Sequence, residues 1–76
     1  MSNVIHVDQE ILGGTPVFAG TRVPIKNLFD YLEDGGSTSG FLNDFPSVKD
    51  DQVNAVLDIA RHLLLSISQI SHENIA

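Results

Sequence analysis

The residues able to do acid–base or metal chemistry are few and widely spaced. The chain has no cysteine, and its three histidines stand at positions 6, 62 and 72. A metal site needs several His, Cys, Asp or Glu ligands that the fold brings together. The pair at helical spacing, Asp58 and His62, is better explained as an ordinary surface contact between residues four apart on a helix.

The paired acids and paired glycines give no clearer sign of catalysis. Asp50 and Asp51 stand where a helix would begin, and the helix dipole favours carboxylates there. Gly13-Gly14 and Gly35-Gly36 lack the following lysine of a phosphate-binding loop. A core built from 76 residues can hardly enclose a substrate pocket. We therefore expect a binding protein and not an enzyme, with no metal and no cofactor.

Charge and size both favour a protein partner. The chain has four basic and ten acidic residues, and its formal net charge of −6 repels nucleic acid at long range. This balance suits a partner that is basic, or one whose groove normally holds an anionic substrate. A chain this short hides only about 60–65% of the surface that its unfolded form exposes. Without disulfides to add stability, association with itself or with a partner is expected.

The chain shows no targeting or membrane signal. Its first ten residues, MSNVIHVDQE, lack the basic start and the long apolar core of a signal peptide. The longest apolar run, residues 63–65 with Ile67 and Ile70, is interrupted by polar residues and is too short to cross a membrane. We expect a cytoplasmic protein without membrane contact.

Short extended pieces are expected before residue 24. β-branched residues around His6 predict a strand. Val17-Phe18 and residues 21–23 are two further β-type pieces, and Ala19-Gly20 between them predicts a tight turn and therefore a hairpin. Pro16 and Pro24 limit how far either arm can extend.

Three helices are expected after Pro24. The first carries an apolar stripe and ends at Gly35-Gly36. The second begins at Ser37 or Thr38 and ends before Pro46, with Gly40 inside it at a cost of about 1 kcal/mol relative to Ala. Ser47 and Asp50 resemble a capping box for the third, long helix. The second half of that helix is apolar around more than one face, which is typical of a helix that is buried on two sides or binds a partner. Because the core is small, we favour a partner.

The link between the second and third expected helices has the spacing of a helix-turn-helix. In that fold the last helix enters the major groove with its N-terminal residues first. Lys49 and Gln52 would then meet phosphates or bases, and Arg22 and Lys26 could add phosphate contacts in a dimer. A trihelical bundle that only shares this topology explains the same spacing, and Arg22 could equally hold the hairpin to an acidic residue of the helices.

Residues 13–24, which read GGTPVFAGTRVP, resemble a family catalogued as domain of unknown function 433 and described as VapB-like antitoxins. The resemblance runs along residues 5–60 and includes Asp8, the GTRVP piece, Phe45-Pro46 and Ala60. The chain departs from the family pattern at Gln9, where proline is common. It departs again at residues 38–40, where acidic residues are common, and this weakens the short second helix.

The resemblance implies a small winged or homeodomain-like helix-turn-helix protein that forms homodimers and is paired with a PIN-like ribonuclease toxin. It implies an antitoxin that neutralises this nuclease, with repression of its own operon as a second role. A PIN-like active site gathers carboxylates around a divalent metal, and an apolar helix with a cation would block it. The residues expected to bind the toxin all lie on the third helix: Arg61, His62, Leu63, Leu64, Leu65, Ile67 and Ile70.

The expected fold class is therefore mainly α, with a short N-terminal β hairpin before a three-helix, helix-turn-helix-like bundle. Residues 1–60 would form the hairpin-plus-trihelical domain, and residues 61–76 an extension of the last helix that binds the toxin. Three alternatives stay open at this point. The apolar face closes a homodimer, the chain is a stand-alone DNA-binding transcriptional regulator, or it is a structural dimer with no nucleic-acid role.

Overall fold

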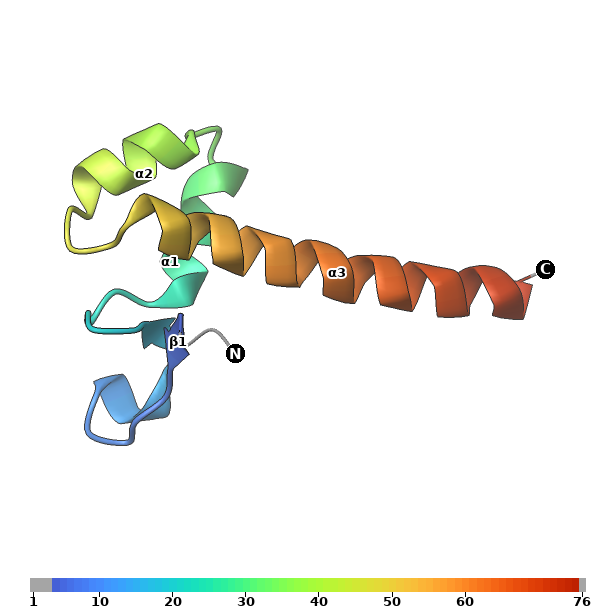
Figure 1. Cartoon of the computed structure of the whole chain (residues 1–76), viewed down its shortest axis with the longest axis horizontal. Coiled ribbons are helices and arrows are strands. Elements are labelled where there is room, and N and C mark those ends of the chain that lie inside the picture. Colours follow the sequence, from blue (N-terminus) through green and yellow to red (C-terminus); the bar gives the residue numbers. More distant parts are fainter. Residues whose placement is uncertain (1–3, 76) are drawn as a thin grey trace.

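A small body of strands and helices carries one long helix (Figure 1). The computed structural model describes residues 4–75, with side chains for residues 4–67. The elements in chain order are β1 (Ile5–His6), a 3₁₀ turn η1 (Leu12–Gly14), β2 (Val17–Phe18), α1 (Ile25–Glu33), α2 (Thr38–Asp44) and α3 (Asp50–Ile75). The predicted fold class is confirmed, because three helices follow short N-terminal strands.

The sheet is a two-stranded antiparallel pair in which Ile5 lies opposite Phe18 and His6 opposite Val17. The predicted hairpin around Ala19-Gly20 therefore forms only in part, because the strand that pairs with β2 is β1. The turn after β2 does form, since the Thr21 amide donates to the Phe18 carbonyl at 3.0 Å. The returning arm, however, meets β2 only at an isolated bridge between Val17 and Pro24. The pairing strand comes instead from the first β-type piece of the chain.

The ends of α1 and α2 lie where the sequence predicts them. Gly35 ends α1 with a φ of 92°, a conformation that glycine adopts without a steric penalty. The Ser37 hydroxyl caps α2 by accepting a hydrogen bond from the Gly40 amide at 3.0 Å. These boundaries depend on local chemistry, which explains why the sequence alone predicts them.

The start of α3 differs from the predicted capping box. The helix begins at Asp50, so a box between Ser47 and Asp50 is wrong by two residues. The reciprocal bond is made instead by Gln52, whose side-chain oxygen accepts from the Lys49 amide at 2.9 Å. This is the second half of a capping box, in which the third helical residue reaches back to the residue before the helix.

The core lies where β2, α1, α2 and the first two turns of α3 meet. Phe41 is fully buried, and its ring centroid lies 5.9 Å from that of Phe18 and 4.8 Å from that of Phe45. Burial of each large side chain stabilises the fold by about 1.5–3 kcal/mol. The buried residues are Val17, Phe18, Leu28, Phe41, Val48, Val53 and Val56.

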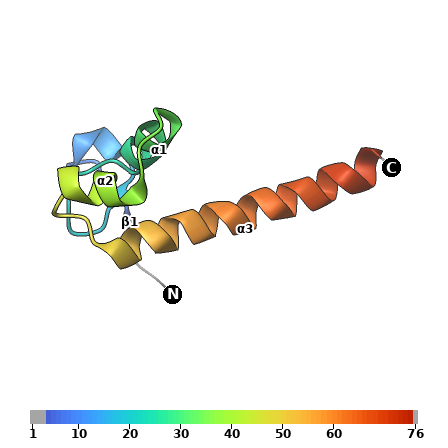
Figure 2. The same ribbon diagram turned by 90° about the horizontal axis from the view of Figure 1, so that it is seen from above.

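The body covers only the beginning of α3. Val56 is the last buried residue in the described part of the helix, and Leu57 packs partly against the core. Beyond this point α3 projects away from the body, as two views at right angles show (Figures 1 and 2). The boundary predicted after residue 60 therefore falls inside one continuous helix, close to where the covering body ends.

Tyr31 of α1 lies against two glycines that flank the start of α2. Its ring makes an edge-on contact with Phe41, at a centroid distance of 5.8 Å. A Cβ at Gly36 would overlap this ring, and a Cβ at Gly40 would lie 2.6 Å from the Tyr31 hydroxyl oxygen. Gly40 therefore makes room for the tyrosine, which offsets its poor helix propensity.

The close approach of Tyr31 to Gly40 predicts that alanine at this helix position destabilises the protein, whereas alanine usually stabilises a helix relative to glycine. Gly40→Ala should lower the free energy of unfolding by about 1 kcal/mol, because overpacking against Tyr31 exceeds the gain in helix propensity. In a Tyr31→Phe background the same change should be neutral or stabilising, since the obstructing oxygen is gone. Chemical denaturation of the four proteins measures this cycle, with Ser39→Ala as the exposed control in α2. Equal effects of Gly40→Ala in both backgrounds would contradict the assignment.

Tyr31 also provides a spectroscopic probe, because the chain has one tyrosine and no tryptophan. A hydrogen bond to Asp44, then burial and the nearby carboxylate charge, raise the pKa of Tyr31 above its usual value. A raised pKa in the folded state stabilises the protein below the unfolded pKa of about 10, and this contribution is lost as pH rises through the folded pKa. Phenolate absorbance should therefore appear at higher pH than in the unfolded chain, and at lower pH again in Asp44→Asn.

Candidate functional site

The part of α3 beyond the body presents large apolar side chains to solvent. We call residues 61–75 the distal segment of α3. Leu63 and Leu64 are 61% and 64% exposed, and Leu65 and Ile67 are 53% and 52% exposed. Large apolar side chains gathered on one surface of a soluble protein mark a site of interaction.

The apolar surface of the distal segment continues the stripe that enters the core. Val53, Val56, Ala60, Leu63 and Ile67 follow each other at intervals of three and four residues, and therefore share one face of α3. The first two of these side chains are buried in the body, whereas the last two are more than half exposed. The stripe is thus covered by this chain at one end only.

Leu65 extends the apolar surface around the helix. It stands two residues from both Leu63 and Ile67, and residues two apart on a helix do not share a face. Its 53% exposure shows that the apolar surface is wider than a single stripe. This agrees with the expectation of a helix that is apolar on more than one side. Ile70, the last residue predicted to bind the toxin, lies outside the residues whose side chains the structure describes.

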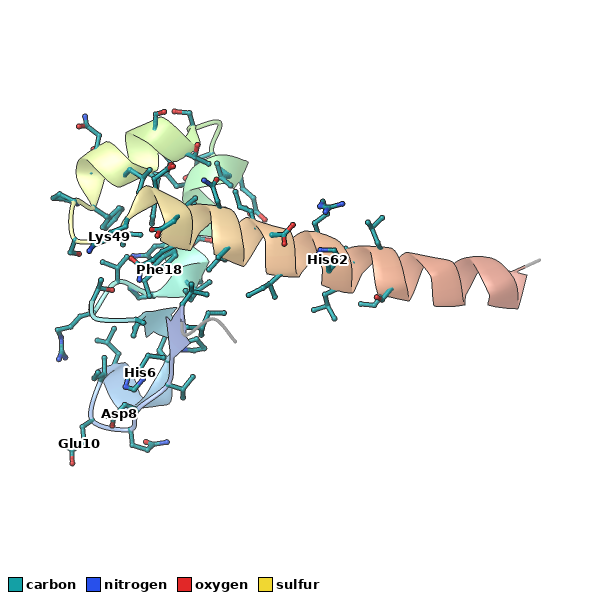
Figure 3. All side chains as sticks on the ribbon, viewed as in Figure 1. His6, Asp8, Glu10, Phe18, Lys49 and His62 are labelled. Atoms are coloured by element: carbon teal, nitrogen blue, oxygen red, sulfur yellow. The ribbon has the colours of Figure 1, made fainter. Side chains whose placement is uncertain are left out.

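The two basic residues of the predicted toxin-binding set contact a carboxylate on their own helix. Arg61 lies 3.4 Å and His62 3.5 Å from the Asp58 carboxylate oxygens. Both are exposed, and Figure 3 shows His62 on the part of α3 that has left the body. Exposed pairs of this kind contribute about 0–1 kcal/mol. The carboxylates of a partner could therefore replace Asp58 at small cost.

Gln52, predicted to read DNA, is already engaged within the fold. Its side-chain nitrogen donates to the Ala19 carbonyl at 2.9 Å, while its oxygen accepts from the Lys49 amide. Both functional atoms of the amide therefore have partners in this structure. The residue joins the turn after β2 to the start of α3, a role that sequence reasoning missed because its partner is 33 residues away.

The three basic residues predicted to contact phosphate stand in different situations. Lys26 forms a 2.7 Å ion pair with Asp30, and this hydrogen bond raises the pKa of the lysine. Lys49 is exposed just before α3, beside the body in Figure 3. Arg22 is exposed and lines a hollow with Ser47, which stands two residues before Lys49. The fold therefore brings Arg22 towards the start of α3 and leaves Lys26 paired on α1.

Comparison with known proteins gives a family. The model of the family described as "Protein of unknown function (DUF433)" matches residues 5–60. The chain belongs to this family. No curated protein and no solved structure matches the chain. The DUF433 region contains the body and the first turns of α3, so the distal segment extends beyond the matched residues.

The described part of the DUF433 chain shows neither a cluster of metal ligands nor a membrane-spanning helix. Among the described residues, no group of three or more His, Cys, Asp or Glu side chains could hold a metal ion. Within residues 4–75, no helix combines the length and the apolar character that a membrane span requires.

The engagement of Gln52 predicts an effect on stability. Gln52→Ala removes two hydrogen bonds and leaves the part-buried Ala19 carbonyl without this donor, so the free energy of unfolding should fall by about 2 kcal/mol. Asn54→Ala, which removes an exposed 3.3 Å contact with Asp50, is the matched control and should change stability by less than about 0.5 kcal/mol. Urea denaturation of the two variants measures the difference. Equal stability of Gln52→Ala and Asn54→Ala would show that the amide is free for another role.

Proposed function

We propose that this chain is the antitoxin of a toxin–antitoxin pair and neutralises a PIN-like ribonuclease by direct binding. The observation that carries the proposal is the exposure of Leu63, Leu64, Leu65 and Ile67 on a helix that projects from the body. The protein acts by occupying its partner's surface and performs no reaction of its own. The antitoxin role itself is what the resemblance of residues 5–60 to the DUF433 family implies.

The energetics of the distal segment favour a stable complex. Each of the four side chains keeps more than half of its surface in water. Full burial of such a side chain stabilises a complex by about 1.5–3 kcal/mol, so about half of that amount is still available at each position. Because these side chains lie on a helix that is continuous with the folded body, little backbone ordering opposes binding.

The charges near the distal segment suit a nuclease partner. Arg61 and His62 stand where the helix leaves the body, and their pairs with Asp58 are exposed. An active site that gathers carboxylates around a metal ion would compete with Asp58 for these donors. The apolar residues would then cover the surface beside the carboxylates and exclude substrate. This arrangement blocks the nuclease without any chemistry on the antitoxin.

Co-expression with the product of the neighbouring open reading frame, which the proposal expects to be a PIN-like nuclease, tests the proposal. Leu64→Asp should weaken the complex by about 100-fold or more, because it removes an apolar anchor and places a charge in the interface. Asn54→Asp adds the same charge to the same helix before the distal segment, and should leave neutralisation unchanged. The readouts are growth of the co-expressing cells and the dissociation constant of the purified pair.

A full-length chain that neither binds nor neutralises the nuclease would contradict the antitoxin assignment. Two further results would contradict the assignment of toxin binding to the distal segment. One is full neutralisation by a chain that lacks residues 61–76. The other is a Leu64→Asp variant that binds the nuclease like the unchanged chain but loses self-association in size-exclusion chromatography. The second result would assign the apolar surface to a homodimer.

A further inference from the structure

A hollow of about 550 Å³ lies in the body, at the corner formed by the turn after β2 and the link between α2 and α3. Both loops lie on the side of the body opposite to the direction in which α3 projects (Figures 1 and 2). The hollow is therefore separate from the distal segment. Its lining residues are His6, Ile11, Ala19, Gly20, Thr21, Arg22 and Ser47.

The polar side chains of this corner hollow are hydrogen-bond donors from three separate segments. The Arg22 guanidinium comes from the turn, the His6 imidazole from β1, and the Ser47 hydroxyl from the link before α3. No carboxylate belongs to the lining set, although the chain as a whole carries a net charge of −6 and the Asp8 carboxylate lies 3.8 Å from the His6 Nε2 atom. Within residues 4–67, Lys26 and Arg61 each pair with an aspartate, whereas Arg22 pairs with none.

The walls of the hollow are held by hydrogen bonds within the fold. Gly20 stands in the turn with a φ of 79°, and the Thr21 hydroxyl donates to the Phe18 carbonyl at 2.8 Å. Gln52 holds the same turn against the start of α3 by donating to the Ala19 carbonyl at 2.9 Å. Because this backbone is already ordered, a ligand that enters the hollow needs to order little more than the Arg22 side chain.

We propose that the corner hollow binds a phosphate group. A tetrahedral oxyanion accepts hydrogen bonds from several directions, which suits donors that come from three segments. Guanidinium–phosphate bonds are charge-assisted and stronger than neutral ones. Ile11 and Ala19 add an apolar wall for the organic part of a phosphate ester. The negative field of the whole chain repels a polyanion, so a free phosphate compound is the favoured source over a nucleic-acid backbone.

Amide NMR of the full-length chain tests this proposal with three probes: inorganic phosphate, adenosine monophosphate and a short DNA duplex. Sodium chloride at matched ionic strength controls for salt. We expect saturable shifts confined to His6, residues 20–22 and Ser47 with the first two probes, at a dissociation constant of about 1 mM. The duplex should leave these signals unchanged. The site is independent of the proposed antitoxin role, since the distal segment takes no part in it.

Variants of exposed residues distinguish phosphate binding in the hollow from a general effect of positive charge. Arg22→Gln should weaken phosphate binding by at least about 10-fold, and Ser47→Ala by about 3-fold, in proportion to the bonds removed. Lys26→Gln removes the same charge from α1, where it pairs with Asp30, and should bind phosphate like the unchanged chain.

Three outcomes would change the phosphate assignment of the corner hollow or overturn it. Local shifts from a duplex that weaken in Arg22→Gln would keep the phosphate site and assign its ligand to nucleic acid. The absence of local, saturable shifts up to about 20 mM phosphate would overturn the proposal. Equal binding by Arg22→Gln and the unchanged chain would also overturn it.

Discussion

The side-chain amide of Gln52 joins the start of α3 to the turn after β2. It accepts from the amide just before α3 and donates to the Ala19 carbonyl. The Ala19 amide in turn donates to the Val4 carbonyl at 2.8 Å, so one residue links the long helix to the segment that leads into β1. Strands of two residues cannot form a stable sheet alone. The strands and the turn therefore depend on this connection and on Phe18 in the core.

The size of that core explains why α3 emerges uncovered. Within residues 4–67, seven hydrophobic residues are buried, and the last of them is Val56. None of the described elements lies over the rest of the helix. Isolated helices are marginal in water, so the distal segment gains from its continuity with the anchored turns and would gain more from a partner surface.

Local features could be predicted from the sequence, and non-local ones could not. Gly35 and Ser37 mark helix ends because their effect involves neighbouring residues only. The partner of β2 was predicted from the nearest β-type piece, but Ile5 and His6 pair with it across a longer loop. The exposed apolar helix follows from a pattern along one element. The corner hollow joins three segments, so no spacing in the sequence indicates that Arg22 and Ser47 line one site.

The order of residues along the distal segment also orients any partner. Arg61 and His62 stand next to the body, and the sequence from 63 to 71 contains no charged residue. Acidic groups of a partner would therefore be favoured near the base of the projecting helix, where the exposed contacts of these two donors with Asp58 can be replaced at low cost. Further along, a charge would be desolvated without a partner, which is unfavourable. In the proposed complex, the helix would therefore favour a partner surface that is acidic at one end and apolar over the rest, and would disfavour binding in the reverse direction.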